Sequence, residues 1–192
     1  MHALLLAAFQ PELDGLDARP PAGWRVACTG VGAIAAAAST ARLIAENRPT
    51  RVLFIGTCGA LSPCLTIGDL ISVSEVLASS LSELEGSAFR PTLEVTRWDP
   101  GWTLPLPAHL VVVPPAITRT EAGAARLAQI AMAEHLELSG VFAACADAGV
   151  PVAAALAVAN RVGPSAHLEW ATNHAGLSAR LRATLESLGV FS

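Results

Sequence analysis

The sequence has 192 residues, of which 53% are hydrophobic and 15% are charged, and its formal net charge is -4. This composition is typical of a globular protein with a sizeable core, and we expect one domain over residues 1–192. The acidic balance and the lack of a basic run exclude an electrostatic footprint for nucleic acid or for an anionic membrane surface. All 12 basic residues are Arg, which excludes Schiff-base and Walker-lysine chemistry.

Targeting and metal signals are both weak. The opening "MHALLLAAFQPELDG" lacks a basic start and meets Pro11 and Glu12 directly after its apolar stretch, which favours a first β-strand over a signal peptide. No apolar run reaches a bilayer-spanning length. The four cysteines form no CxxC pair, and no His lies at zinc-finger spacing from them. We therefore expect a cytoplasmic protein with no metal, cofactor or disulfide framework.

Apolar runs alternate with helical stretches along the chain. Strands are predicted at residues 2–9, 24–32, 50–57, 69–77, 109–115 and 150–160. Helices are predicted at residues 33–48, 119–134, 137–149 and 165–189. Residues 79–107 are polar and then rich in Pro and Trp, and are expected to be irregular. The alternation predicts an α/β fold, with a largely parallel or mixed sheet that is covered on both faces by helices.

Polar residues and glycines gather where predicted strands end. Glu12 follows the first strand, Thr29–Gly32 ends the second, Gly56–Gly59 ends the third, and Asn160 ends the last. In sheets of this kind ligands bind at the carboxyl ends of the strands. Gly56 and Gly59 would let a loop approach a ligand closely, although glycines at such positions usually only form the turn that follows a strand. Their coincidence predicts a binding site at this edge of the sheet.

Four segments, in this order, resemble the nucleoside phosphorylase and nucleosidase superfamily: "LLLAAFQPEL", "TGVGAIAAAASTARLI", "IGTCGALSPCLTIGDLISVSE" and "LELSGVFAACADAGVPVAAALAVAN". The resemblance implies a three-layer fold, with a central mixed sheet flanked by helices. Two further segments, "NRVGPSAHLEW" (160–170) and "SEVLASSLSELEGSAFRP" (74–91), resemble the futalosine hydrolases of menaquinone biosynthesis. This resemblance implies an N-glycosyl hydrolase whose substrate is a small purine nucleoside, futalosine, and whose products are hypoxanthine and dehypoxanthinyl futalosine. It also implies a homo-oligomer of two or more chains.

The resemblance assigns roles to three residues. Glu12 would position and activate the attacking water, and Glu137 would accept hydrogen bonds from the ribose 2′- and 3′-hydroxyls. Asn160 would hydrogen-bond purine N7 without delivering a proton, which suits a 6-oxopurine leaving group. Each residue also has a purely structural alternative. Glu12 would be a solvated acid in a turn, Glu137 an acid at a helix N-terminus, and Asn160 a cap at the end of a strand. By the same resemblance, the substrate-binding set also includes Thr57, Cys58, Gly59, Phe89, Thr118 and Leu136.

Three alternative functions stay open at this point. Methylthioadenosine/S-adenosylhomocysteine nucleosidases have Asp where this chain has Asn160. A phosphorylase would need arginines for phosphate, and none lies near Gly30 or Gly56 in the sequence. A non-catalytic nucleoside-binding protein is suggested by Leu156, where many relatives have Arg, and by the altered loop at 79–82. Water is therefore the favoured acceptor.

Two arginines and three tryptophans are candidates for the outer part of the site. Futalosine carries a benzoate-type carboxylate, with which Arg90 or Arg161 could pair, a solvated surface position being the alternative for both. Trp98, Trp102 and Trp170 are expected to pack over the site or at a subunit interface.

Overall fold

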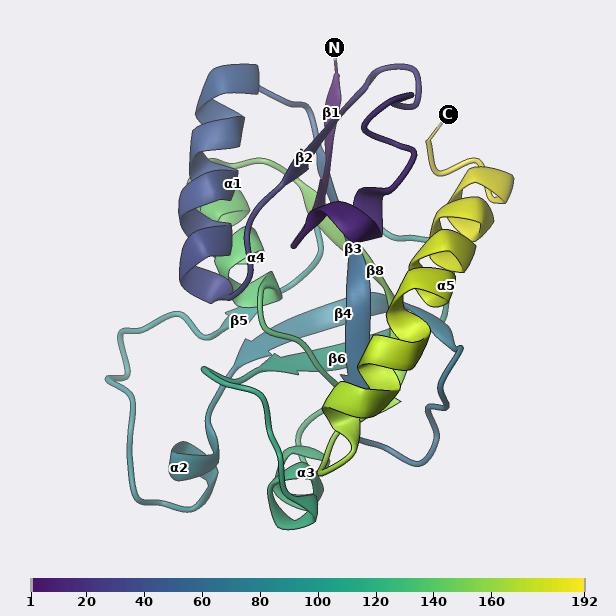
Figure 1. Ribbon diagram of the computed structural model, residues 1–192. Helices are drawn as coiled ribbons and strands as arrows, with labels where there is room; N and C mark the ends of the chain where they lie inside the picture. The colour runs from purple at the N-terminus through teal and green to yellow at the C-terminus, as the bar shows by residue number, and fades with distance from the viewer. Residues whose placement is uncertain (1, 192) are drawn as a thin grey trace.

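The computed structural model describes residues 2–191 (Figure 1). Its strands are β1 (Ala3–Ala7), β2 (Trp24–Cys28), β3 (Val52–Ala60), β4 (Leu70–Ala78), β5 (Arg97–Trp98), β6 (Ala108–Val113), β7 (Ala133–Glu134) and β8 (Val152–Arg161). Its helices are α1 (Ala33–Asn47), α2 (Leu81–Leu84), α3 (Glu121–Leu127), α4 (Leu138–Asp147) and α5 (Ala166–Ser187), with a short 3₁₀ helix, η1, at Gln10–Leu13.

Strand β3 is the centre of the sheet. It pairs in parallel with β1 and β8 and antiparallel with β7, and β2 extends the sheet beyond β1. Strand β8 also pairs with β4, β4 with β6, and β6 with β7, so that β3, β8, β4, β6 and β7 form a closed ring. The short β5 adds to β4. The sheet is thus mixed, which confirms the α/β fold expected from the sequence.

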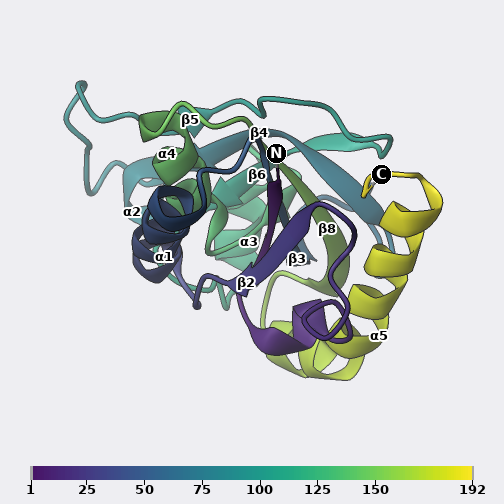
Figure 2. The same ribbon diagram turned by 90° about the horizontal axis from the view of Figure 1, so that it is seen from above.

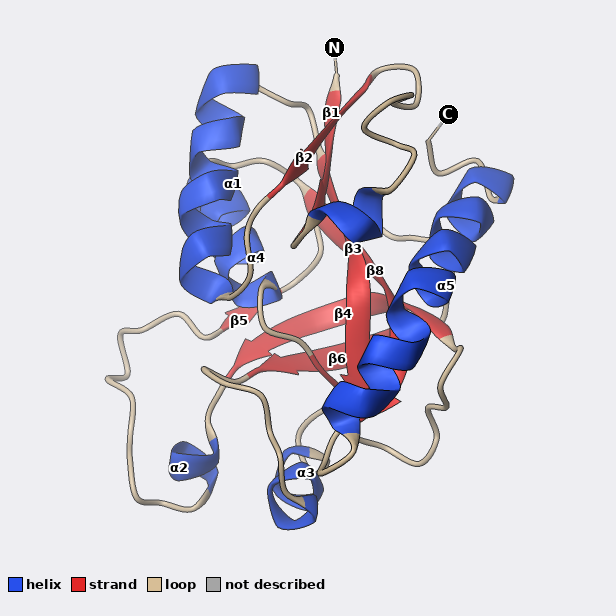
Figure 3. Ribbon diagram, in the orientation of Figure 1, coloured by secondary structure: helices blue, strands red, loops and turns tan. Residues whose placement is uncertain are grey.

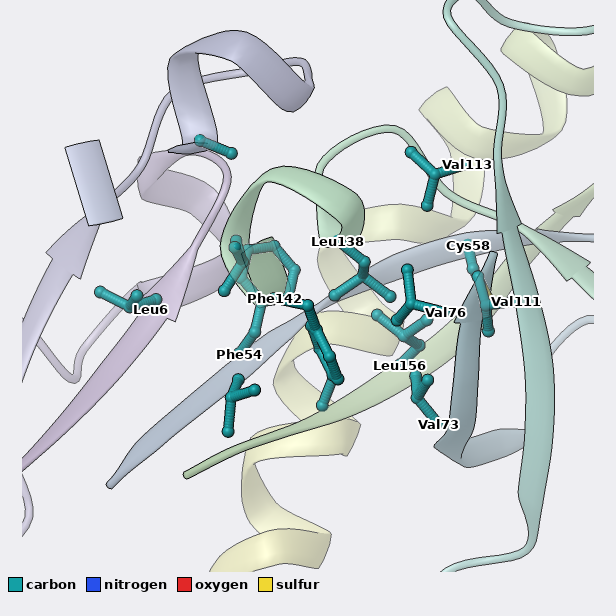
Figure 4. Close-up of a cluster of buried hydrophobic side chains, with 14 of the residues drawn as sticks. Leu6, Phe54, Cys58, Val73, Val76, Val111, Val113, Leu138, Phe142 and Leu156 are labelled. Atoms are coloured by element: carbon teal, nitrogen blue, oxygen red, sulfur yellow. The ribbon is translucent and has the colours of Figure 1, made fainter. Parts of the chain in front are cut away.

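Helices cover the sheet on both faces (Figure 2). Helices α1 and α4 pack against each other on one face, and α5 lies on the other. Along β1 the side chains alternate between two buried clusters. Leu6 joins the cluster under α1 and α4, with Phe54 and Phe142 (Figure 4). Leu5 joins the cluster under α5, which includes Leu181. This alternation makes the first strand apolar throughout, because both of its faces are buried.

The contact between α1 and α4 depends on one glycine. A Cβ atom built on Gly140 of α4 would overlap the backbone carbonyl oxygen of Ala33 at the start of α1. The backbones of the two helices therefore touch at this crossing, and only a residue without a side chain fits there. The close approach holds the first turn of α1 beside the first turn of α4, directly after the candidate site residues Leu136 and Glu137.

The helix predicted at 119–134 is wrong in its second half. Helix α3 ends at Leu127, and Thr120 is its N-cap, with its Oγ1 accepting a hydrogen bond from the N–H of Gly123 at 3.0 Å. Residues 133 and 134 are instead extended as β7 and fill the gap between β3 and β6. The backbone groups that these neighbouring strands leave open outweigh the helical preference of the local sequence.

The glycine-rich segment at 56–59 also differs from the expected loop. Strand β3 runs through it to Ala60, and the pairing with β8 shifts by one residue between Cys58 and Gly59. The segment is therefore a bulged strand end, which places its backbone at the carboxyl edge of the sheet.

Residues 79–107 contain only α2 and β5 as regular elements and otherwise run as loop (Figure 3). This agrees with the irregular segment predicted there. Among residues 2–191, no helix combines the length and the apolar character needed to cross a bilayer.

Candidate active site

A pocket of about 340 Å³ opens at the carboxyl ends of β1, β3 and β8. Its lining includes most of the residues that the sequence singles out: Glu12, Thr57, Cys58, Gly59, Leu136, Glu137 and Asn160. These residues come from η1, the end of β3, the start of α4 and the end of β8. The topology thus brings together segments that lie up to 148 positions apart in the sequence.

The Glu12 carboxylate is held by three donors. Its Oε1 accepts hydrogen bonds from the backbone N–H of Thr57 at 3.0 Å and from Thr57 Oγ1 at 3.1 Å. Its Oε2 accepts only the N–H of Ala8, at 3.2 Å. A carboxylate oxygen has two lone pairs, so Oε1 is saturated and Oε2 retains one for a further donor. Glu12 lines the pocket, and Oε2 is therefore the atom that can hold a water molecule there.

The direction of the Thr57 hydroxyl proton is fixed by Trp170. The indole Nε1–H of Trp170 donates to Thr57 Oγ1 at 3.1 Å. An indole N–H can only donate, so the hydroxyl accepts from Trp170 and directs its own proton to Glu12. A chain of hydrogen bonds therefore runs from α5 through β3 to η1 and orients the Glu12 carboxylate.

Burial changes the proton affinity of Glu12. The residue is only 3% exposed, and desolvation raises its pKa from 4.5 to about 7, with a smaller contribution from the nearby Glu137 carboxylate. The hydrogen bonds from Thr57 and Ala8 act in the opposite direction and limit the shift. A carboxyl group whose pKa lies near neutrality is suited to accept a proton during a reaction. This places Glu12 among the groups that can act as a general base.

Glu137 lies at the N-cap of α4, facing the start of α1. Its Oε1 accepts the backbone N–H of Gly32 at 2.8 Å, and Gly32 adopts a φ of +89°, which favours glycine. The Nδ1 atom of His135 accepts the N–H of Glu137 at 3.1 Å and lies 3.3 Å from Glu137 Oε2. Burial lowers the pKa of His135, against the opposing effect of the Glu137 carboxylate. Because Nδ1 accepts the N–H of Glu137, it does not donate a proton to Glu137 Oε2. The lone pairs of Glu137 Oε2 therefore stay available to hydroxyl donors in the pocket.

Asn160 and Gly59 are neighbours across β8 and β3. Asn160 is 9% exposed, and its Nδ2 donates one hydrogen bond to the carbonyl of Arg161 at 3.0 Å. The second amide hydrogen and the side-chain oxygen remain for a ligand. A Cβ atom on Gly59 would lie 2.9 Å from Asn160 Nδ2 and 2.7 Å from Val162 Cγ2. The glycine therefore leaves room for the amide to lie over the end of the strand.

Trp170, which was expected to pack over the site or at a subunit interface, belongs to an aromatic wall on one side of the pocket, whereas the sequence analysis did not place Phe9 or His167 there. Trp170 and His174 stack with ring centroids 4.2 Å apart, His167 stacks on Trp170 at 6.0 Å, and Phe9 lies 5.9 Å from Trp170. Phe9, His167 and Trp170 line the pocket. The three-, four- and seven-residue spacings along residues 167–174 place these rings on one face of α5, and this periodicity was the available signal.

Several predicted residues lie outside the pocket lining. Phe89 is 89% exposed in the irregular segment. Arg90 of the same segment pairs with Glu83 at 2.6 Å and Glu94 at 2.9 Å, so its charge is already matched. Thr118 is buried next to the pocket, where its N–H donates to Glu134.

Two departures that suggested a non-catalytic protein lie away from the pocket. Leu156 is buried in the core under α4 (Figure 4), and residues 79–82 lie at the end of β4 and the start of α2. Of the three tryptophans considered for the outer site, Trp170 lines the pocket, whereas Trp98 and Trp102 do not.

The electrostatic character of the pocket is acidic. The side chains that line it, within the described residues, include three carboxylates and no arginine. The three carboxylates belong to Glu12, Glu134 and Glu137. Such a lining attracts hydroxyl and N–H donors and repels an anion such as phosphate.

Comparisons with known proteins agree with this geometry. Residues 24–118 match the family model of the phosphorylase superfamily. A curated futalosine hydrolase from Streptomyces coelicolor is 32% identical, with 88% of each chain covered.

Solved structures show the same fold. A 5′-methylthioadenosine/S-adenosyl homocysteine nucleosidase from Helicobacter pylori superimposes with a TM-score of 0.85 at 16% identity, covering 98% of this chain and 97% of that one. A futalosine hydrolase mutant from the same organism gives a TM-score of 0.84 at 16% identity, with 98% of both chains covered. Since the identity to the Streptomyces protein extends over most of both sequences, this chain belongs to the phosphorylase superfamily, in its futalosine hydrolase family.

Proposed function

We propose that the protein hydrolyses the N-glycosidic bond of a purine nucleoside, and that its substrate is futalosine, which it splits into hypoxanthine and dehypoxanthinyl futalosine for menaquinone biosynthesis. The observation that carries the proposal is the pair of carboxylates, Glu12 and Glu137, in one pocket with the Asn160 amide. The similarity to the Streptomyces futalosine hydrolase supports the choice of substrate.

The water-activating step is assigned to Glu12. The bond between the anomeric carbon and the purine nitrogen breaks through an oxocarbenium-like transition state, and a water must attack the opposite face of the sugar. Glu12 Oε2 has one lone pair left to accept a hydrogen bond from that water. As the carbon–oxygen bond forms, the water proton passes to Glu12, and the electron pair of the broken bond leaves with the purine.

Asn160 and Glu137 are assigned to the two halves of the nucleoside. The Asn160 amide hydrogen-bonds N7 of the departing purine and disperses its negative charge. It has no proton to deliver, which suits an oxopurine, since the departing anion is stabilised by its carbonyl group. Glu137 accepts hydrogen bonds from the ribose hydroxyls and fixes the sugar so that water and leaving group lie in line.

Water is favoured over phosphate as the acceptor. Phosphorolysis would bring an anion next to the carboxylates of Glu12 and Glu137, and none of the pocket-lining side chains in residues 2–191 is an arginine that could neutralise it. A water molecule carries no net charge, so the acidic lining does not repel it. This argues against a purine nucleoside phosphorylase.

The proposal is tested by incubating the purified protein with futalosine, aminodeoxyfutalosine, methylthioadenosine and inosine, with and without phosphate, and measuring the released base. Hypoxanthine release from futalosine without any need for phosphate is the expected result. Preferential release of adenine from methylthioadenosine would instead assign the methylthioadenosine nucleosidase function. No base from any substrate, with a folded protein, would favour the non-catalytic nucleoside-binding alternative.

The pH dependence of hydrolysis is expected to follow Glu12. Its pKa is raised to about 7, mainly by desolvation, and the general base acts in its ionised form. The value of kcat/KM for futalosine should therefore rise with pH and reach half of its plateau near pH 7. Initial rates of hypoxanthine release between pH 5 and 9 at constant ionic strength measure this. A flat profile over this range would remove Glu12 from the role of base.

Replacing Glu137 by Gln is expected to weaken the grip on the sugar. The amide oxygen can still accept the N–H of Gly32, but the amide nitrogen cannot accept a hydroxyl proton. A hydrogen bond to a charged group contributes about 1.5–3 kcal/mol, so kcat/KM should fall roughly 10- to 100-fold. The 2′-deoxy analogue is the control substrate, because it lacks one of the hydroxyls concerned. An equal loss on both substrates would contradict the assignment.

A homo-oligomer is also part of the proposal. Val31 and Ile117 line the pocket and are 66% and 56% exposed, and Ile34 and Leu168, on the first turns of α1 and α5, are 88% and 73% exposed. A second copy of the chain would cover such apolar side chains, and sedimentation equilibrium should then give at least twice the chain mass of 19.7 kDa. The cytoplasmic location and the single domain over residues 1–192 stay predictions.

A further inference from the structure

One buried carboxylate oxygen of a pocket-lining residue has no hydrogen-bond partner among the described residues. Glu134 of β7 is 7% exposed and is one of the residues that line the pocket. Its Oε1 accepts the backbone N–H of Thr118 at 3.1 Å, whereas its Oε2 is buried without a hydrogen-bond partner among the described residues. An unsatisfied buried carboxylate oxygen is costly, so a ligand that supplies a donor at this point would be stabilised.

The sheet places Glu134 and Asn160 on either side of one glycine. Gly59 of β3 pairs with Asn160 of β8 on one side and with Glu134 of β7 on the other. Residues paired directly across neighbouring strands point their side chains to the same face. Neighbouring strands lie about 4.8 Å apart, so the backbones of Glu134 and Asn160 are separated by about 10 Å. The bare backbone of Gly59 forms the floor between them.

This arrangement is complementary to the edge of a 6-oxopurine. Such a base presents N7, the carbonyl O6 and the N1–H in sequence along one edge. The Asn160 amide can donate to N7 or to O6, and Glu134 Oε2 can accept from N1–H. A 6-aminopurine has a lone pair at N1, which would face the lone pairs of the carboxylate. A site built to accept an N–H disfavours an analogue that lacks it.

We infer that Glu134 reads the N1–H of the purine and thereby selects a 6-oxopurine over a 6-aminopurine, with Thr118 holding its other oxygen in place. This inference rests on the proposed function, since it concerns the base end of the same pocket. It assigns to Glu134 a substrate contact that is separate from the bond-breaking groups. Thr118, expected from the resemblance to bind substrate, then acts as a positioning residue through its backbone.

The decisive variant is Glu134→Gln. Its side-chain oxygen can still accept the N–H of Thr118, so the local structure is preserved, but its amide nitrogen presents hydrogens instead of lone pairs to the base. For the wild type we expect kcat/KM to be higher for futalosine than for aminodeoxyfutalosine, which differ at the 6-position. In the variant this ratio should fall roughly 10- to 100-fold, the range expected for a hydrogen bond to a charged group. Glu121→Gln, at an exposed position at the start of α3, is the matched control and should keep the wild-type ratio.

A binding measurement separates this inference from the proposed function. Calorimetry compares hypoxanthine, 1-methylhypoxanthine and adenine on the wild type, and needs neither turnover nor a variant that folds. Hypoxanthine should bind at least 10-fold more tightly than 1-methylhypoxanthine, in which the N1–H is replaced. Equal binding of the two, or an unchanged substrate ratio in a folded Glu134→Gln protein, would overturn the role of Glu134 even if futalosine is hydrolysed. Tight, N1–H-dependent hypoxanthine binding without turnover would support it while the hydrolase proposal fails.

Discussion

Replacing Glu12 by Gln is expected to lower futalosine turnover by roughly 10²- to 10⁴-fold, the usual contribution of a general base, while raising the melting temperature at pH 8. The loss of rate follows because an amide cannot accept the proton of the attacking water. Single-turnover hypoxanthine release measures it. Glu186→Gln, on the exposed side of α5, is the control for a neutralised carboxylate elsewhere and should keep full turnover.

The gain in stability follows from the pKa of Glu12. Desolvation raises this pKa from 4.5 to about 7 in the folded protein. Between these values the folded chain binds a proton that the unfolded chain has released, so the free energy of unfolding falls as pH rises. At 1.4 kcal/mol per pH unit, the ionised carboxylate costs the folded state about 3 kcal/mol above pH 7. The Gln variant lacks this cost. It is destabilised by about 1 kcal/mol at another point, because the N–H of Ala8 loses its acceptor.

Melting curves at two pH values make the prediction specific. At pH 8 the variant should melt several degrees above the wild type, since about 1 kcal/mol shifts the melting temperature of a chain of this size by 2–4 °C. At pH 5, where Glu12 of the wild type is protonated, the difference should disappear or reverse. A difference that is the same at both pH values would show that the ionisation of Glu12 does not oppose folding.

Replacing Gly140 by Ala is expected to cause a large loss of stability, because this is the described glycine whose added Cβ would approach a backbone atom most closely. The new Cβ would overlap the carbonyl oxygen of Ala33, and neither backbone can move without separating α1 from α4. Overpacking of this kind costs about 1–3 kcal/mol and more where backbone is in the way, and we expect at least 3 kcal/mol here. Urea denaturation monitored by circular dichroism gives the change in unfolding free energy.

The matched control is another helical glycine. Gly176 of α5 has no atom within 4 Å of the position that a Cβ would occupy. Gly176→Ala should therefore stabilise the protein by up to about 1 kcal/mol, because alanine favours the helix and restricts the unfolded chain. If both glycines responded alike, the effect at Gly140 would reflect helix propensity and not the contact with α1.

Much of the fold was predictable because its elements have strong local signals. The buried strands are continuous apolar runs, and α1 is an alanine-rich segment that ends before Pro49, so their positions agree within a few residues. Strand β7 was not predictable, since residues 133 and 134 become extended only when β3 and β6 offer hydrogen bonds on both sides. Such pairing with strands that are distant in the sequence cannot be predicted from the residues around 133 and 134 alone.

The candidate site divides in the same way. Glu12, Glu137 and Asn160 follow recognisable motifs, and all three line the pocket. Glu134 lies in the segment that was expected to be helical, where its side chain would have no defined neighbour. Phe89 was expected at the pocket from its motif, but its segment has few regular elements to place it there.

The hydrogen-bond chain from Trp170 through Thr57 to Glu12 has a consequence for biosynthesis. Its links join residues that are 113 and 45 positions apart, so the chain connects three segments that are distant in the sequence. While the ribosome is still making α5, the carboxylate of Glu12 lacks the indole that orients its support. The orientation of the Glu12 carboxylate is therefore complete only after α5 has docked on the sheet.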